Sequence, residues 1–463
     1  MNAVSTIRRS VLALSVGFSL LFAQGAFAQG VSKSPALRLG VSEAIDMAIK
    51  ASETVQQREN DVTSSYYKRK EAVSQWLPQV NADAGYNYYP SVQTTSVAIV
   101  PGSPAVSVAL KKDFDLSTTV SLQQMFYDFG KVHHAINAAS HGQRANEWGR
   151  EAARRDMAYM TVMAYMKVLL AQKVVSIAKG SYDNAVRTRS ILDEKYEFGR
   201  IPRGDGIKSQ ADIAARLPVL KEAESDLDLA MRNLKRLTDI PEEQGVSLTD
   251  SLVSKFPRYD ADKSLDQMFD VEPHLKLIEE TITLNTETAK AEKAQYYPTL
   301  GMYASYSLFA QSDDPYLGHD EFQNIGNVGL NLSIPIWNGN RTWSRYKQAL
   351  MQKENSKLEL EKANRDLILE LRNAISEYDS LLDTYPASVE AVRLAKESFD
   401  AQGDSFRAGS LTLTELNDAE LQLTNNRLRE ALVLFNINQS IARIERLISG
   451  EGEKSWETRY LAE

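Results

Sequence analysis

The sequence predicts a mainly α-helical protein with membrane β-strands, built from two duplicated halves. Three observations support this fold class: motifs that recur in the same order, strand pairs of alternating polarity, and helices far longer than in ordinary globular domains. The repeated motifs are residues 75–80 and 295–300, 126–130 and 335–339, and 196–199 and 406–409. The closing glycines of the last two motifs are 69 residues apart in the first copy and 70 in the second. Each copy is therefore a structural half rather than a short solenoid unit.

The N-terminus has the pattern of a secretory signal peptide over residues 1–28. Arg8 and Arg9 precede an apolar run, and a small-x-small motif ends at Ala28. The mature chain is then expected to begin at Gln29. The alternative is a retained membrane anchor, for which the apolar run is short.

Composition narrows the possible classes of protein. The net charge is -8, from 61 acidic and 53 basic residues, which provides no electrostatic surface for nucleic acid. The chain has no cysteine, which excludes disulfides, thiolate metal sites and a lipidated N-terminal cysteine. Beyond the leader, no stretch approaches 18 consecutive apolar residues. Any membrane contact of the mature chain is therefore expected to use β-strands.

The strands are expected in two pairs, at about 80–89 with 114–126 and at about 300–309 with 326–336. Apolar and polar residues alternate in each, and the length of about 10 residues suits a tilted strand in a bilayer. Tyrosines gather near the strand ends, as in an interfacial girdle. Four strands cannot close a barrel, so several chains would have to combine. The alternative is two amphipathic hairpins on a soluble sandwich.

Two external loops are expected between the strands of each pair. They comprise residues 89–113 and 309–323. Residues 91–107 are rich in Ser, Pro and Thr, as in a mobile loop.

The helices are expected to form a hairpin in each half, at 131–237 and 341–448. The long first arm of each hairpin, about 68 residues, would extend about 100 Å. In the second hairpin, Pro386 is the one expected bend of this arm. Shorter helices at 53–76 and 273–296 lead into the strands. We expect 205–237 to stack on 273–296, and 411–448 on 53–76. A solvated coiled coil without a lumen is the alternative.

The chain thus divides into consecutive segments. The first repeat covers 29–240, an equatorial linker 241–272, and the second repeat 273–449, before a C-terminal equatorial tail at 450–463. Residues 37–52 and 238–272 and the tail are expected to form a belt at mid-height.

With these motifs in this order, the chain resembles the TolC-like outer-membrane channel-tunnel family. The resemblance rests on the leader, the strand entries at Pro78 and Pro298, the strand exits at Gly130 and Gly339, and the two helix turns. It implies a homotrimer with a 12-strand outer-membrane β-barrel continuous with a 12-helix periplasmic α-barrel. It also implies a passive export duct that works with a periplasmic adaptor and an inner-membrane ABC or proton-driven pump. Type I protein secretion is the leading assignment, since no lipid anchor is present, and drug or metal efflux is the alternative.

The resemblance also implies site residues. Acidic residues after the turns would form a periplasmic gate, at Glu415, Asp418 and Asp205. The same acids have a structural explanation, because acids in a first helical turn complement the helix dipole. The tips that dock the adaptor would be Phe198, Gly199, Arg200, Ala408, Gly409 and Ser410.

This chain departs from the family at the pore latch. The family has a tyrosine before the second turn and an arginine after it, and here Phe406 and Leu411 stand at those positions. The closed state is then expected to rely on packing or on other polar residues such as Tyr196, Arg200 and Arg203.

We find no catalytic motif and predict no enzyme activity, cofactor or metal site. His133, His134 and His141 lack the spacing that places two ligands on one helix face, so they are expected to be solvated. Two further classes stay open. A trimeric surface adhesin also anchors with four strands per chain, and a soluble periplasmic coiled-coil adaptor has long helices without membrane strands.

Overall fold

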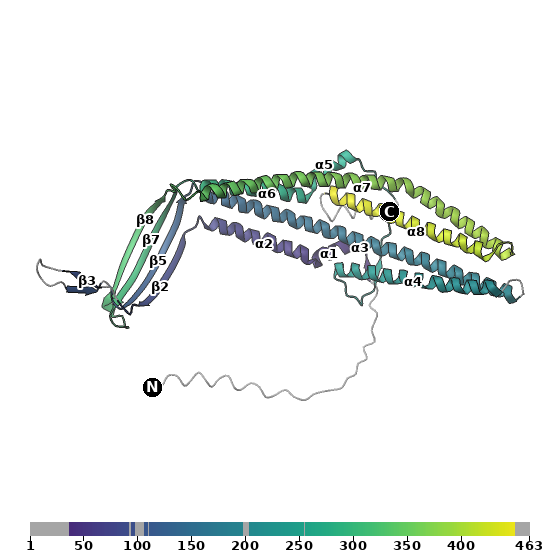
Figure 1. Cartoon of the computed structure of the whole chain (residues 1–463), viewed down its shortest axis with the longest axis horizontal. Helices are drawn as coiled ribbons and strands as arrows, with labels where there is room; N and C mark the ends of the chain where they lie inside the picture. The colour runs from purple at the N-terminus through teal and green to yellow at the C-terminus, as the bar shows by residue number, and fades with distance from the viewer. Residues whose placement is uncertain are drawn as a thin grey trace, which may run out of the picture.

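A computed structural model describes residues 37–91, 94–97, 106–109, 111–197, 203–253 and 255–449. A four-stranded sheet forms one end of an elongated chain, and a layer of very long helices extends from it (Figure 1). The predicted signal peptide and the tail at 450–463 lie outside the described residues.

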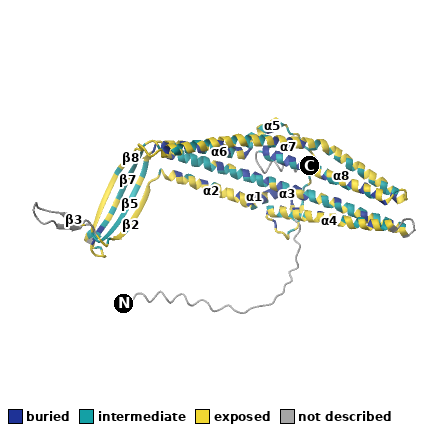
Figure 2. Cartoon of the chain, in the orientation of Figure 1, coloured by how far each residue is buried: buried dark blue, intermediate teal, exposed yellow. Residues whose placement is uncertain are grey.

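The sheet is antiparallel throughout and has the order β2-β5-β7-β8. Its strands are β2 (Gln79–Tyr88), β5 (Phe114–Tyr127), β7 (Thr299–Ser312) and β8 (Phe322–Ser333). The central pairing, β5 with β7, joins the two halves of the sequence. The edge strands β2 and β8 are coloured as exposed in Figure 2, whereas β5 and β7 are mostly intermediate.

The register sorts the side chains of all four strands by polarity. Val80 lies opposite Leu122, which lies opposite Ala304, which lies opposite Val328. One residue further along β2, a polar row begins with Asn81 and continues across the sheet through Ser121, Ser305 and Asn327. Because side chains alternate between the two faces of a sheet, one face is apolar and the other polar.

Two expectations about the strands require correction. The fourth strand spans Phe322–Ser333 rather than 326–336. It stops before Pro335, which has no N–H to donate to a ladder, and Ile336 beyond it is 95% exposed. In addition, part of the loop expected at 91–107 forms a hairpin, in which β3 (Thr94–Val97) pairs with β4 (Val106–Ala109).

The helices repeat in length between the two halves. The first half has α2 (Glu53–Ser74), α3 (Lys131–Glu197) and α4 (Arg203–Thr238), of 22, 67 and 36 residues. The second has α6 (Pro273–Ala294), α7 (Arg341–Ala408) and α8 (Leu413–Ile448), of 22, 68 and 36. Helix α7 continues through Pro386, and α4 contains Pro218. The equal lengths support duplication of a complete strand-and-helix unit.

The expected stacking of the short helices is wrong. Helices α6 and α8 both lie between α3 and α7, whereas α2 and α4 follow one another along the other side of α3 (Figure 1). Strand order accounts for the leading helices, because each strand pair sets its leading helix beside its own long helix, and α8 is placed by its packing against both α3 and α7. The pairing of β5 with β7 then brings α6 against α3.

The short elements expected in a belt lie beside the helices at mid-height (Figure 1). Strand β1 (Leu37–Leu39) pairs in parallel with β6 (Val246–Leu248), beside α1 (Val41–Ala51). Helix α5 (Ala261–Val271) packs against α7 and α8. The largest apolar clusters lie here, one around Tyr165 and one around Tyr378. The belt thus lies at the level where α2 meets α4 and where α6 meets α8.

Among the described residues, α3 contains one 18-residue window that is apolar enough to cross a membrane, with a mean hydropathy of 1.3. Packing accounts for part of this composition, since 33% of the window is buried inside the chain. The residues Ala158, Val162, Tyr165 and Met166 of α3 belong to the belt's buried cluster, which also includes residues of α1 and α4.

Candidate functional site at the helix turns

The turn between α7 and α8 is built on a glycine in the left-handed region. Gly409 has φ +85°, and its N–H donates to the carbonyl of Phe406. The N–H of Ser410 reaches back to the carbonyl of Ser405 at 3.0 Å. These bonds satisfy carbonyls at the end of a helix, and the left-handed conformation suits glycine. The predicted tip Ala408–Ser410 is therefore a tight, exposed turn. The other predicted tip, Phe198–Arg200, lies outside the described residues.

An apolar layer lies directly behind this turn. Phe406 is buried with Leu192 of α3 and with Leu413 and Leu416 of α8. The ammonium of Lys195 lies 4.6 Å from the centroid of the Phe406 ring and donates to the Phe406 carbonyl. Leu411 packs against the same cluster. At this level the two hairpins are joined by packing and by a bond to a backbone carbonyl.

Among the predicted gate acids, Glu415 has a clear structural role. Its carboxylate accepts from the Thr412 hydroxyl at 2.7 Å and from the Thr412 N–H at 2.9 Å. The Glu415 N–H in turn donates to the Thr412 hydroxyl, completing a capping box. The hydroxyl and N–H bonds lower the pKa of the Glu415 carboxyl, so it carries its charge at neutral pH.

Asp418 and Asp205 have different surroundings. Asp418 is exposed and lines a groove of about 480 Å³ between α3, α4 and α8. Asp205 lies in the first turn of α4 and is half-buried. It is not among the residues that line this groove. Within one chain the structure therefore does not gather the three acids into a single cluster.

Sequence reasoning missed two charged residues in the same groove. Arg216 of α4 and Glu420 of α8 form an ion pair with side chains 15% and 5% exposed. A signal was present, because Glu420 interrupts an apolar stripe formed by Leu413, Leu416 and Leu423. Arg216 gave no comparable signal.

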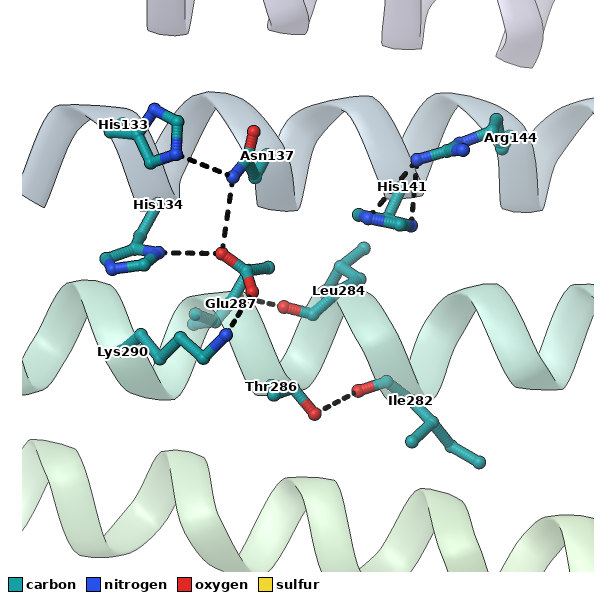
Figure 3. Close-up of polar contacts among 11 residues, drawn as sticks. His133, His134, Asn137, His141, Arg144, Ile282, Leu284, Thr286, Glu287 and Lys290 are labelled. Carbon is teal, nitrogen blue, oxygen red and sulfur yellow. Dashed lines mark hydrogen bonds and ion pairs between the residues drawn. The ribbon is translucent and has the colours of Figure 1, made fainter. Parts of the chain in front are cut away.

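A second polar array joins α3 to α6 near the sheet (Figure 3). His134 Nδ1 lies 2.7 Å from Glu287 Oε2, and His141 Nδ1 lies 2.6 Å from Glu280 Oε2. Lys290 also pairs with Glu287, at 2.7 Å. The expectation of solvated histidines is therefore wrong for His134 and His141, which are paired and partly buried.

The same array perturbs one acid strongly. Burial favours the neutral form of Glu287, but hydrogen bonds from Lys290 and His134 outweigh it and lower its pKa to about 2. The two histidines are seven residues apart on α3, and so are their partners on α6 in the reverse direction. The array therefore specifies the register of these antiparallel helices. Across the described ranges, no cluster of three or more His, Asp or Glu residues is arranged to hold a metal ion.

An antiparallel sheet with one apolar and one polar face leads into two long helical hairpins. This arrangement is that of outer-membrane channel subunits whose strands continue into a helical tunnel. A family model described as "Outer membrane efflux protein" matches residues 44–238 and 272–450. The chain belongs to this family, and the predicted resemblance is confirmed. It is accordingly an outer-membrane channel component rather than an enzyme, and the adhesin and soluble-adaptor alternatives are set aside.

Individual relatives are distant but cover most of the chain. It is 24% identical to outer membrane protein TolC of Escherichia coli over 82% of this chain and 76% of that protein. It is also 24% identical to the cobalt-zinc-cadmium resistance protein CzcC of Cupriavidus metallidurans, over 73% and 79%. Alkaline protease secretion protein AprF of Pseudomonas aeruginosa is 24% identical over 67% and 65%.

Solved structures show the same fold at low sequence identity. The outer-membrane channel OprN superposes with a TM-score of 0.74 at 15% identity, covering 89% of this chain and 90% of that one. CusC gives a TM-score of 0.73 at 14% identity, covering 90% and 93%.

Proposed function

We propose that three copies of the chain form a passive export duct, with a 12-strand barrel in the outer membrane and a 12-helix tunnel in the periplasm. The sheet carries this proposal, because its order ends in β2 and β8 and neither has a second partner among the described strands. Unpaired strand edges are costly in lipid. The edge strands run in opposite directions, so β8 of one copy can pair antiparallel with β2 of the next.

The polarity of the two faces supports the same assembly. The row of Val80, Leu122, Ala304 and Val328 would face lipid, and the row beginning at Asn81 would face the lumen. Val328 is 77% exposed and Val80 is 62% exposed in the single chain, as suits a surface covered by lipid.

The mass of the purified protein in detergent tests the assembly. We expect a trimer, because three four-stranded sheets provide a closed ring. A stable monomer would falsify the barrel.

Energy and substrate choice are assigned to partners, a periplasmic adaptor and an inner-membrane pump of the ABC or proton-driven kind. Type I protein secretion is the leading assignment, supported by the protease-secretion relative AprF and by the lack of a cysteine for lipid attachment. Metal or drug efflux is the second candidate, favoured by the relative CzcC. Secretion of a reporter protein on co-expression with a candidate pump and adaptor distinguishes the two.

Docking of the adaptor is assigned to the two predicted tips, 198–200 and Ala408–Ser410. The second of these lies at the end of α7 farthest from the sheet. Site-specific crosslinking from Ala408 tests this docking. Crosslinks confined to the belt around 238–272 would contradict it.

The gate is assigned to Glu415 and Asp418, with Asp205 as a third acid. Three copies around one axis would place a ring of negative charge at the entrance, which favours cations. Capping by Glu415 is the competing explanation. Two double variants separate the roles: Glu415→Ala with Asp418→Ala, and Glu415→Gln with Asp418→Asn.

Both double variants are expected to stay trimeric and to lose block by multivalent cations in planar bilayers. The second retains size and hydrogen-bonding capacity, so its loss of block would report charge. If multivalent cations still block the pores of both double variants unchanged, the constriction is instead assigned to Asp205 or to the Phe406 layer.

A further inference from the structure

The level where the strands meet the helices is positively charged in a chain that is negative overall. The segments that join a strand to a helix at this level are residues 66–78, 127–135, 287–298 and 336–347. Together they contain nine lysines and arginines and four acidic residues, whereas the whole chain has a net charge of -8. Eight of the nine basic side chains are exposed, and two of the acids, Asp128 and Glu287, are buried. The other two, Glu71 and Glu292, leave most of the surface charge unmatched.

Three aromatic rings show which side of this level continues the apolar face of the sheet. Tyr127 lies opposite Leu300, which is four residues from Ala304 of the apolar row, so Tyr127 is on the apolar face. The centroid of the Phe129 ring lies 4.8 Å from that of Tyr127 and 5.4 Å from that of Tyr297. The three side chains are 46% to 54% exposed. Exposed aromatic rings at the end of an apolar strand face are typical of a membrane interface.

Two lysines of α6 lie on the same side as these rings. Lys290 and Lys293 precede Tyr297 by seven and four residues, and such spacings share one face of a helix. The helical bonds reach this tyrosine, because its N–H donates to the carbonyl of Ala294 at 3.1 Å. Since α6 lies between α3 and α7 of its own chain (Figure 1), this face of α6 stays open in the proposed trimer.

The depth of the two lysines suits the phosphate layer of a membrane. At 1.5 Å per residue, Lys293 and Lys290 lie about 6 and 10 Å below Tyr297 along the helix. The headgroup layer is about 5 to 7 Å thick on each side of a bilayer, and a lysine can extend its ammonium group up toward it. Lys293 forms no ion pair with any described residue, whereas Lys290 pairs with Glu287.

The first half of the chain repeats this arrangement. Lys70 of α2 precedes the strand-opening Pro78 by eight residues, which is also the separation of Lys290 from the proline that opens β7. Leu77, at the position of Tyr297, is 56% exposed. Both strand entries therefore combine an exposed apolar side chain at the edge of the sheet with an exposed lysine two helical turns away.

We propose that Lys70, Lys290 and Lys293 bind the phosphates of anionic phospholipids in the periplasmic leaflet of the outer membrane. This inference rests on the proposed function, in which the helices extend into the periplasm. The acyl chains would cover the apolar face of the sheet, the aromatic rings would lie at the interface, and the ammonium groups would pair with the phosphates. Phosphatidylglycerol fits this surface better than phosphatidylcholine, because the positive charge of choline offsets the charge of its phosphate. The bound headgroups would fix the depth of the sheet in the membrane.

Native mass spectrometry of the protein in detergent, titrated with either lipid carrying the same acyl chains, tests the surface. We expect wild type to bind phosphatidylglycerol more tightly than phosphatidylcholine. Lys290→Gln with Lys293→Gln is expected to weaken phosphatidylglycerol binding about tenfold and to leave phosphatidylcholine binding unchanged. Lys221→Gln with Lys357→Gln is the matched control, because it removes the same charge from two exposed lysines that pair with a glutamate three residues away, as Lys290 does.

Each result has a defined meaning. Equal binding of the two lipids by wild type, a preference that the double variant retains, or an equal loss in the control would overturn the lipid surface. If the double variant does not assemble, Lys293→Gln decides, since Lys293 has no ion pair to lose, and an unchanged preference in it would overturn the surface. Wild-type trimers that form pores without a lipid preference would refute the surface and leave the duct in place. A wild-type chain that forms no trimer would overturn the duct, and the surface with it.

Discussion

Single residues in this protein have electrostatic or packing roles that their sequence positions do not reveal. Glu287 is the clearest case, because its carboxylate is held by Lys290 and His134 on two helices. Gly329 is another, because a Cβ at that position would lie 2.7 Å from the ring of Tyr303. Each leads to a test by a single substitution.

Glu287→Gln is expected to lower the unfolding temperature at neutral pH. The folded-state pKa is depressed from 4.5 to about 2, so the charge contributes stability above pH 4.5 that is lost as the pH falls through about 2. Unfolding temperatures of wild type and variant should therefore converge as the pH is lowered through this window. Glu354→Gln, at an exposed ion pair of α7, is the control. A difference that is independent of pH would contradict the electrostatic account.

Gly329→Ala is expected to destabilise the sheet by about 1 kcal/mol, the lower end of the cost of overpacking, because the crowded atoms belong to the outer end of a 44% exposed tyrosine. The Tyr303 ring would have to leave its place over the glycine. Gly326→Ala is the matched control on the same strand, since its Cβ would lie at an ordinary 3.7 Å from Tyr306. Thermal unfolding of the two variants in detergent measures the difference, and equal unfolding temperatures would rule out the packing explanation.

At the scale of elements, the α7/α8 turn depends on a backbone conformation that favours glycine. The α7/α8 turn depends on a positive φ at Gly409 and on the donation of its N–H to Phe406. The turn is separated from the strand pairings by the full length of α7, so a change at the turn should leave the sheet intact.

Gly409→Pro is expected to abolish most export while leaving trimer insertion intact. Proline fixes φ near −65° and has no N–H, so it can adopt neither the conformation nor the hydrogen bond of this turn. Secretion assays and native mass measurement together report the two effects. Ser410→Ala is the control, because it removes one hydroxyl bond at 3.1 Å and retains the backbone geometry. Normal export by the Gly409→Pro variant would show that docking of the adaptor does not depend on this turn.

For the whole molecule, the sheet and the α7/α8 turn lie at opposite ends of the chain (Figure 1). Hairpin β3–β4 extends from the end of the sheet that is remote from the helices. A channel in the outer membrane with its helices in the periplasm would display this hairpin outside the cell.

Thr95→Cys is expected to react with a bulky, membrane-impermeant maleimide in intact cells. Thr95 lies on β3, and the native chain has no cysteine, so there is no background labelling. Ala408→Cys, at the helix turn, should be labelled only after the cells are broken. Absence of labelling at Thr95 in intact cells, with labelling after lysis, would reverse the topology.

The sequence by itself determined the long helices, the four strands of the main sheet and the family of this protein. Alternation along residues 80–88 and 300–308, the length of the uninterrupted helices and the repeated glycines are local signals, and each element can be read from its own residues. The limit of the fourth strand could have been read too, since Pro335 cannot continue a ladder. The family followed from the order and spacing of the motifs.

Only the tertiary structure decided which helices lie side by side and which charges meet. The order β2-β5-β7-β8 places α2 beside α3 and α6 between α3 and α7, but the sides on which α4 and α8 fold back are settled by helix packing, which local patterns do not encode. Arg216 and Glu420 are 204 residues apart in the chain, and they meet because α4 and α8 both pack against α3. A periodic pattern marks which face of a helix is buried, but strand pairing and the direction in which each hairpin folds back decide which helix covers it.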